Sequence, residues 1–313
     1  VLPVAQNISR AAYSKRPGFA LAFPSLPGKR AAMSRIVLLN GSYLAIEDAK
    51  IPIMDRGFLF GDGIYEVTAV LDGRLIDNGP HLERLNRSLG EIGIENPHGN
   101  DEWTRLQTEL VRRNALREGV VYIEVTRGVF ERDFLCPQDL TPTVAMFTQP
   151  KNLRDNPAVR ARAAVITVPD LRWKRRDIKS VALLGQVLAK QAARAAGAAE
   201  AWLVEDGLVT EGASSTAFLI AKDRRIVTRP LSTAVLPGVT RGAILRLAER
   251  HRLKFEQRAF SVAEACAAAE TFYTSASTVV MPVVSIDGKR IGDGRPGPLT
   301  TELRQLYLEM AIA

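Results

Sequence analysis

The spacing of hydrophobic positions divides the first half of the chain into short strands and two helices. Residues 64–71 are rich in strand-forming side chains and end at Asp72-Gly73, a dipeptide typical of hairpin turns. Residues 80–92 and 101–116 carry apolar or amphipathic side chains close to a helical period. Further strand patterns occupy residues 36–39, 74–76, 120–127 and 143–148. The pattern predicts a small α+β domain over residues 36–150.

Polar residues and prolines then indicate an interdomain linker at residues 151–160. Residues 162–168 have the composition of a strand, and residues 181–196 form a predicted helix that Gly197 caps. Five apolar side chains share one face of this helix: Val181, Leu184, Leu188, Ala192 and Ala195. Short strand pairs recur around predicted turns at Glu205-Asp206-Gly207, Lys222-Asp223 and Asp287-Gly288. We therefore expect a larger α+β domain over residues 161–313, with much antiparallel sheet.

The positive charge of the chain is concentrated at its start. The formal net charge is +8, but residues 1–35 contain six basic residues and no acidic one, which leaves +2 on the remaining 278 residues. This distribution argues against a surface that binds nucleic acid. We interpret residues 1–35 as a basic N-terminal extension, which is either an organelle targeting segment or a segment upstream of a true start at Met33.

Hydropathy and cysteine content limit the cellular setting. No apolar run reaches the roughly 18 to 20 residues that a membrane-spanning helix needs, so we expect a soluble protein. The two cysteines, Cys136 and Cys266, cannot form a framework of several disulfides, and they lack the spacing of a metal site. We expect no metal and a cytoplasmic location, with organelle targeting by residues 1–35 as the alternative.

Two segments contain residue types suited to a reactive centre, although each is unspecific by itself. Residues 55–67 place three glycines within seven positions before a strand, which lets the loop approach a ligand closely. Residues 175–180 place Lys179 directly before a helix, where a partly dry site would keep its amine neutral and nucleophilic. The alternative interpretations are an ordinary glycine-rich turn and a solvated basic turn.

A third segment, residues 210–215, contains Glu211 and is followed at residues 236–241 by a turn that opens a helix running to about Arg252. Free N–H groups at the start of that helix suit a phosphate, and so does the hydroxyl of Thr240. The alternative interpretation is a hairpin end followed by an ordinary capped helix.

Together these segments resemble the fold-type IV enzymes that use pyridoxal 5'-phosphate (PLP). This family includes D-amino acid aminotransferases, branched-chain aminotransferases and aminodeoxychorismate lyases. The resemblance covers residues 36–310 and is strongest to the D-amino acid aminotransferases. The matching runs are Asp-Arg-Gly at 55–57, Phe-Gly-Asp-Gly-Ile-Tyr-Glu-Val at 60–67, Asp-Ile-Lys-Ser at 177–180 and Leu-Leu-Gly-Gln-Val-Leu-Ala-Lys-Gln at 183–191. The resemblance implies a two-domain α+β fold with mixed and antiparallel sheets and flanking helices.

The resemblance also assigns a cofactor site residue by residue. Lys179 would form the aldimine with PLP and carry the proton between the substrate Cα and C4' of the cofactor. Glu211 would pair with the pyridine nitrogen and keep the ring protonated. Arg84 would bind the phosphate, together with main-chain and hydroxyl donors of Val239 and Thr240.

The resemblance gives Ser215 as a further expected cofactor contact. One position of the expected site, residue 276, departs from the family pattern. Ala276 stands where the family commonly places a threonine hydroxyl on the phosphate. Ser275, Ser277 or backbone N–H groups would then compensate for the missing hydroxyl.

The expected substrate site departs from the family pattern as well. The resemblance places the substrate carboxylate on Tyr65 and on an Arg-x-His pair, which here falls on Arg132 and Phe134. Arg132 retains a group that binds a carboxylate bidentately. Phe134 in place of the histidine removes one donor and makes the pocket more apolar.

The resulting hypothesis is PLP-dependent transamination between a D-amino acid, such as D-alanine or D-glutamate, and a 2-oxo acid, such as pyruvate or 2-oxoglutarate. The alternatives on the same fold are a branched-chain L-amino acid aminotransferase, an aminodeoxychorismate lyase and an (R)-amine transaminase. Residues 65–67 favour the D-amino acid branch, and Arg132 argues against the amine transaminase. A catalytically silent ligand-binding relative is the alternative outside the enzymes. The resemblance also implies a homodimer, in which a loop of the partner subunit completes each active site.

Overall fold

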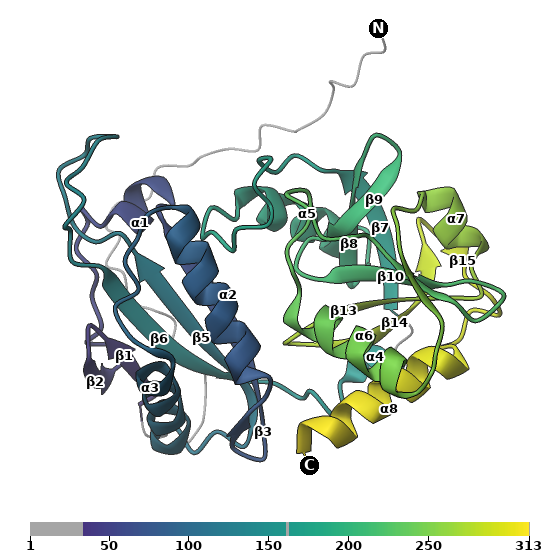
Figure 1. Cartoon of the computed structure of the whole chain (residues 1–313), viewed down its shortest axis with the longest axis horizontal. Helices are drawn as coiled ribbons and strands as arrows, with labels where there is room; N and C mark the ends of the chain where they lie inside the picture. Colours follow the sequence, from purple (N-terminus) through teal and green to yellow (C-terminus); the bar gives the residue numbers. More distant parts are fainter. Residues whose placement is uncertain (1–33, 161–162, 313) are drawn as a thin grey trace, which may run out of the picture. The chain divides into compact units, whose positions relative to one another are not determined.

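Six antiparallel strands form the first sheet of the protein (Figure 1). The computed structural model describes residues 34–160 and 163–312. The strands of this sheet are β1 (Ile36–Leu39), β2 (Ser42–Ala45), β3 (Gly63–Leu71), β4 (Arg74–Leu75), β5 (Glu118–Thr126) and β6 (Thr143–Pro150). Their spatial order is β2-β1-β6-β5-β3-β4. The strands predicted in this half of the sequence are confirmed, and β2 is an additional strand that the pattern did not predict.

Two helices pack against this sheet and bury its apolar side chains. They are α2 (Asn78–Glu91) and α3 (Asn100–Arg113), both of which the helical period predicted. Leu85 of α2 and Trp103 of α3 lie fully buried in one cluster with Ile123 of β5. A third helix, α1 (Arg56–Phe60), lies inside the glycine-rich segment and was not predicted. The Asp55 carboxylate caps α1 by accepting a hydrogen bond from the Gly57 N–H.

The second sheet is mixed. Its strands are β7 (Ala163–Pro169), β8 (Glu200–Glu205), β9 (Leu208–Gly212), β10 (Thr216–Ile220), β11 (Ile226–Thr228), β12 (Phe255–Gln257), β13 (Glu270–Ser275), β14 (Val279–Ile286) and β15 (Lys289–Arg290). The order is β12-β11-β10-β13-β14-β7-β8-β9, and β15 pairs with β14. The pairs β11/β12, β14/β7 and β7/β8 are parallel, whereas the others are antiparallel. The predicted fold class is therefore confirmed.

Five helices accompany the second sheet: α4 (Pro157–Arg160), α5 (Leu184–Ala195), α6 (Val239–Arg250), α7 (Val262–Ala267) and α8 (Pro298–Ile312). Ile244 of α6 and Leu303 of α8 pack against Phe218 and Phe272 of the sheet in one buried cluster. Figure 1 shows α6 and α8 close to the strands that they cover. This packing fixes the start of α6 against β10 and β13, where the candidate site lies.

The predicted turns are confirmed at the ends of the strand pairs. Both residues of Asp72-Gly73, Asp206-Gly207 and Asp287-Gly288 have positive φ. This is the backbone conformation that a two-residue hairpin turn requires, and aspartate and glycine tolerate it. Lys222 and Asp223 lie between β10 and β11, as expected.

The environment of α5 differs from that of an ordinary amphipathic helix. The residues that α5 buries are Ala189 and Ala193, whereas Leu184 and Leu188 on the predicted apolar face are 71% and 52% exposed. The hydrophobic period therefore predicted the helix correctly, but the described part of the chain does not cover the apolar face. An exposed apolar face of this kind is typical of a surface that binds another molecule.

Residues 1–33, which include Met33 and nearly all of the predicted N-terminal extension, lie outside the described residues. All described strands of the first sheet precede residue 151, and those of the second follow residue 160. The division into two domains with a linker at 151–160 stays a prediction. Among the described residues, no helix is long and apolar enough to cross a membrane.

Candidate functional site

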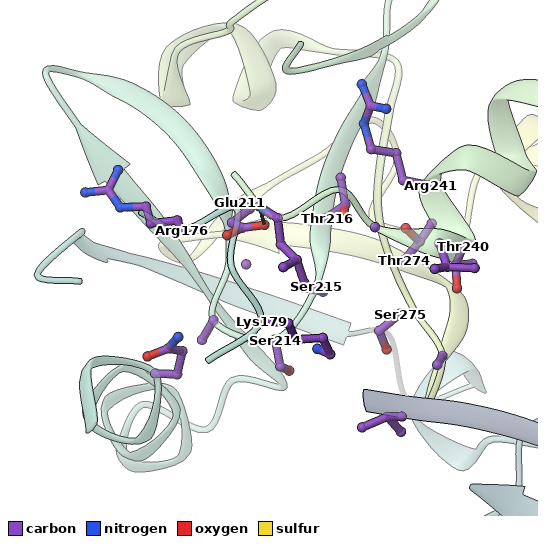
Figure 2. Close-up of a pocket in the computed structure, with 18 of the residues that line it drawn as sticks. Arg176, Lys179, Glu211, Ser214, Ser215, Thr216, Thr240, Arg241, Thr274 and Ser275 are labelled. Atoms are coloured by element: carbon purple, nitrogen blue, oxygen red, sulfur yellow. Dashed lines mark hydrogen bonds between the residues drawn. The ribbon is translucent and has the colours of Figure 1, made fainter. Parts of the chain in front are cut away.

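A cavity of about 240 Å³ lies between elements of both sheets. Its lining comes from β3, from α2, from the segment before α5, from the β9–β10 turn, from the start of α6 and from the end of β13. Figure 2 shows part of this lining, including Lys179, Glu211, Thr240 and Ser275. Nine residues expected in the site from the sequence line this cavity: Tyr65, Arg84, Lys179, Glu211, Ser215, Val239, Thr240, Ser275 and Ala276.

Lys179 is held at the cavity by main-chain pairing with β3. The Tyr65 N–H donates to the Lys179 carbonyl at 3.0 Å, and the Val181 N–H donates to the Gly63 carbonyl at 3.0 Å. The glycine-rich entry to β3 therefore docks against the lysine segment, which explains why these two motifs occur together. The Lys179 Nζ lies 4.0 Å from the centroid of the Tyr65 ring. The amine is thus placed over an aromatic face at the edge of the cavity.

Glu211 of β9 is buried at the cavity and has two hydrogen-bond partners. Its Oε1 accepts from Arg172 Nη1 at 2.5 Å, and its Oε2 accepts from the Leu236 N–H at 3.1 Å. Burial raises the pKa of this carboxyl, and the Arg172 guanidinium opposes that shift without reversing it. Asp170 holds Arg172 through Nε and Nη2, at 2.9 and 2.8 Å. Glu211 therefore lies at the end of a buried ion-pair network.

Arg84 lies on α2, the helix that packs against the first sheet, and it lines the cavity. It donates to both carboxylate oxygens of Glu66, at 2.7 and 2.9 Å, and to the Pro237 carbonyl at 2.8 Å. His81 Nδ1 lies 2.9 Å from the same carboxylate. Burial alone would raise the pKa of Glu66, but Arg84 and His81 hold it below its usual range. Burial lowers the pKa of His81, so the pairing is mainly that of Glu66 with Arg84.

The start of α6 forms the end of the cavity beyond Arg84. Gly238 is the N-cap, and no side chain of the described residues caps the helix there. The first N–H groups of α6, those of Val239 and Thr240, consequently lack intrahelical acceptors. Positive helix-end charge and free donors favour an anion at such a position.

The serines of the cavity are occupied by partners in the protein. The Ser215 hydroxyl donates to the buried Glu200 carboxylate at 3.0 Å. The Ser275 hydroxyl lies 2.7 Å from that of Thr278 and 3.3 Å from that of Ser277. A ligand at this end of the cavity would compete with these contacts for the serine hydroxyls.

Arg132 and Phe134 do not line the cavity of their own chain. Both lie on an exposed segment, and Phe134 is 78% exposed. Both side chains lie near Phe60: the centroids of the Phe134 and Phe60 rings are 5.5 Å apart, and the Arg132 guanidinium lies 5.7 Å from the Phe60 centroid. Their assignment to the substrate site stays a prediction, and it requires that they act in another copy of the chain.

Arg172 and His81 contact residues of the site and were not predicted from the sequence. Arg172 was not singled out because its partner Glu211 is 39 positions away, and no local pattern connects them. His81 and Arg84 are three positions apart on α2, a spacing that places two side chains on one face of a helix. That spacing is the one local signal that could have indicated their shared contact with Glu66.

Comparison with known proteins gives a family for this chain. The profile of amino-transferase class IV matches residues 63–286. A D-alanine aminotransferase of Bacillus licheniformis is 42% identical over 268 residues, which make up 86% of this chain and 94% of that protein. A D-alanine aminotransferase of Staphylococcus aureus (strain MSSA476) is 39% identical over 272 residues, or 86% of this chain and 95% of that protein.

Solved structures of the same fold are also similar. The branched-chain amino acid aminotransferase of Escherichia coli aligns with a TM-score of 0.82 at 22% identity, over 89% of this chain and 95% of that one. Another branched-chain amino acid aminotransferase, from the organism abbreviated T.th, was solved with N-(5'-phosphopyridoxyl)-L-glutamate. It aligns with a TM-score of 0.79 at 25% identity, over 89% of this chain and 94% of that one.

Proposed function

The chain belongs to the class IV aminotransferases, which are PLP-dependent enzymes, and from this we propose that it transfers the amino group of a D-amino acid to a 2-oxo acid. D-alanine or D-glutamate would be the donor, and pyruvate or 2-oxoglutarate the acceptor. The observation that carries the proposal is that Lys179, Glu211 and Arg84, which are far apart in the sequence, line one cavity. The D-alanine aminotransferases among the relatives support the choice of donor.

The donors and acceptors of the cavity fit PLP. Lys179 supplies an amine for the aldehyde carbon, Glu211 a buried carboxylate for the ring nitrogen, and the start of α6 unpaired N–H groups for the phosphate. Arg84 adds a cation beside that helix start. When bound, PLP supplies an electron sink for the carbon from which the amino group leaves.

Four residues of the chain would perform the proton chemistry and the orientation. The Lys179 Nζ would remove the proton from the substrate Cα and would deliver it to C4' of the cofactor. Glu211 would hold the proton at the ring nitrogen, and Arg172 would keep the carboxylate oriented. The Tyr65 ring, 4.0 Å from the Lys179 amine, would limit the directions in which that amine can move.

We also propose that the enzyme works as a homodimer. Three apolar side chains of α5 are exposed: Leu184, Val187 and Leu188. They are sequence neighbours of Leu183 and Gln186, which line the cavity at the start of this helix. A second exposed set includes Phe134 and Leu135. Removal of such apolar area from water contributes about 25 cal/mol per Å² in favour of association, from which the entropic cost of association is subtracted. A second copy of the chain would cover these surfaces. It would also bring its own Arg132 to the cavity of the first copy.

A half-reaction screen tests the donor. The holoenzyme is mixed with D-alanine, D-glutamate, L-leucine, L-valine and simple amines, and conversion of bound PLP to its amino form is followed by absorbance. We expect the D-amino acids to react faster than the others. Faster reaction with L-leucine or L-valine would move the assignment to the branched-chain aminotransferases, and reaction with amines alone would show that Arg132 binds no carboxylate.

A cytoplasmic location is part of the proposal. The free Cys136 and Cys266 suit a reducing compartment. Fractionation of cells that express the full chain, or a chain beginning at Met33, tests the location. Recovery of only the longer form in an organelle would instead identify residues 1–35 as a targeting segment.

A further inference from the structure

Two threonines lie opposite each other on neighbouring strands at the cavity. Thr216 of β10 pairs with Thr274 of β13 in the antiparallel register. Residues directly opposite in such a pair have their side chains on the same face of the sheet. Two positions further along each strand, Phe218 and Phe272 stack with ring centroids 4.6 Å apart and pack in one cluster with Ile244 of α6. The face that carries the two threonines is therefore the face that α6 covers.

The threonines lie at the start of α6 rather than along its middle. A Cβ built on Gly238, the N-cap of α6, would lie 2.7 Å from the Thr216 Oγ1. Thr216 therefore contacts the first turn of the helix, and Thr274 is its direct neighbour across the strands. Figure 2 shows Thr216, Thr240 and Thr274 among the side chains that line the cavity.

The Thr274 hydroxyl has no hydrogen-bond partner among the described residues, although Thr274 is only 2% exposed. Two other buried threonines of this sheet, on β13 and β11, bond their hydroxyls to main-chain carbonyls. Thr271 donates to the Val283 carbonyl at 3.1 Å, and Thr228 donates to the Ala217 carbonyl at 3.0 Å. Leaving a buried donor unpaired is unfavourable. A ligand in the cavity that accepts a hydrogen bond would remove this penalty.

A second unpaired donor belongs to the first turn of α6, on a side chain that points away from Thr274 in Figure 2. Arg241, in the first turn of α6, is 4% exposed, and its Nε has no partner in the described part of the chain. Its guanidinium donates to the Arg229 carbonyl and the Gln257 side-chain oxygen, and it forms no ion pair within residues 34–160 and 163–312. The free helix start and the free Thr274 hydroxyl favour an anion that accepts hydrogen bonds, and the unbalanced positive charge of Arg241 in the same helix turn adds to this preference.

We propose that Thr274 binds the phosphate group of the cofactor through its hydroxyl. Its hydroxyl supplies the hydrogen bond that the methyl side chain of Ala276 cannot give. The inference rests on the proposed function, because that function places the phosphate at the start of α6. It adds a binding residue that the expected site lacked, and it explains how the cavity tolerates alanine at position 276.

The test compares PLP with pyridoxal, which lacks the phosphate, on the purified full chain after removal of bound cofactor. Thr274→Val keeps the shape of the side chain and removes the hydroxyl. We expect this variant to bind PLP about tenfold to a hundredfold more weakly, as loss of a hydrogen bond to a charged group does. Its affinity for pyridoxal should be unchanged. Its cofactor-free form should unfold at the same temperature as the wild type or at a higher one, because no unpaired hydroxyl is left.

Thr271→Val is the matched control on the same strand. It removes a hydroxyl that has a partner, so it should lower the unfolding temperature of the cofactor-free protein and leave PLP affinity unchanged. Equal PLP affinity in Thr274→Val and wild type would overturn the role of Thr274, and so would an equal loss of PLP and pyridoxal. A wild-type chain that binds neither compound would instead overturn the proposed function, and this inference with it.

Discussion

Replacing Arg172 with methionine removes the only ion-pair partner that Glu211 has among the described residues. The Arg172 guanidinium and the Glu211 carboxylate are both nearly buried, so water replaces little of the lost contact. After the substitution, the hydrogen bond from the Leu236 N–H is the remaining contact to the Glu211 carboxylate. Asp170 also loses Arg172 but keeps Thr210 and, at 3.3 Å, Arg176. Glu211 is therefore the group that responds most strongly.

Removing one partner of a buried ion pair typically costs about 3 to 5 kcal/mol, because the other charge stays buried. Glu211 can escape this penalty by taking up a proton. Burial already raises its pKa above the usual 4.5, and the loss of Arg172 raises it further. The unfolded chain ionises at the usual pKa, so stability is lost as the pH rises through the folded-state pKa, at up to about 1.4 kcal/mol per pH unit. We expect Arg172→Met to destabilise the cofactor-free protein by about 3 kcal/mol at pH 8 and by less than about 1 kcal/mol at pH 5.

Urea unfolding of the cofactor-free protein at pH 5, 6, 7 and 8 measures this difference. Arg112→Met, which breaks an exposed pair with Glu109, is the control and should show no pH-dependent loss of stability.

Adding Glu211→Gln to Arg172→Met should remove most of the pH dependence, since residue 211 is then uncharged. PLP should stabilise Arg172→Met more than wild type, because the ring-nitrogen cation replaces the missing guanidinium. A loss that is the same at every pH would refute the reasoning and would show that Arg172 acts only by packing.

Two further predictions concern the proposed reaction and assembly. Lys179→Ala should abolish both the yellow colour of the cofactor-bound protein and measurable turnover, because no other lysine of the described residues lines the cavity. A coloured, active variant in a spectrophotometric assay would show that another amine bonds the cofactor. Leu188→Glu places a charge on the exposed apolar face of α5 and should convert a homodimer to monomers. Size-exclusion chromatography with light scattering measures this change in mass. A wild-type chain that is monomeric at micromolar concentration would contradict the dimer proposal.

Local sequence predicted much of the secondary structure but less of the environment of each element. The period of α5 indicated a helix, yet Leu184 and Leu188 on its apolar face are exposed. A hydrophobic period indicates which face a helix presents to a partner, and it does not tell whether the partner lies in the same chain. The short α1 was missed because its five residues contain one glycine and no full helical period.

The candidate site shows the same division. Lys179, Glu211 and Arg84 were found because their motifs resemble those of a family, and the cavity brings all three together. Phe134 and Arg132 were assigned to the substrate site in the same way, but their own chain leaves them exposed, and that assignment stays a prediction. The ion pair of Arg172 with Glu211 could not be predicted, because it joins positions 39 apart through the packing of β9.

The sequence by itself determined most strands and helices of the first sheet, the hairpin turns at Asp-Gly pairs, and the family to which the lysine and glutamate motifs point. These features depend on side chains that are neighbours along the chain or that recur in fixed runs. Only the tertiary structure decided which polar groups are paired and which are left without a partner among the described residues. Thr274 and Thr271 are the same residue type on one strand, but Thr271 reaches a carbonyl and Thr274 does not. That difference depends on how β13 packs, because Thr271 reaches the Val283 carbonyl of β14, whereas Thr274 lies on the face that α6 covers.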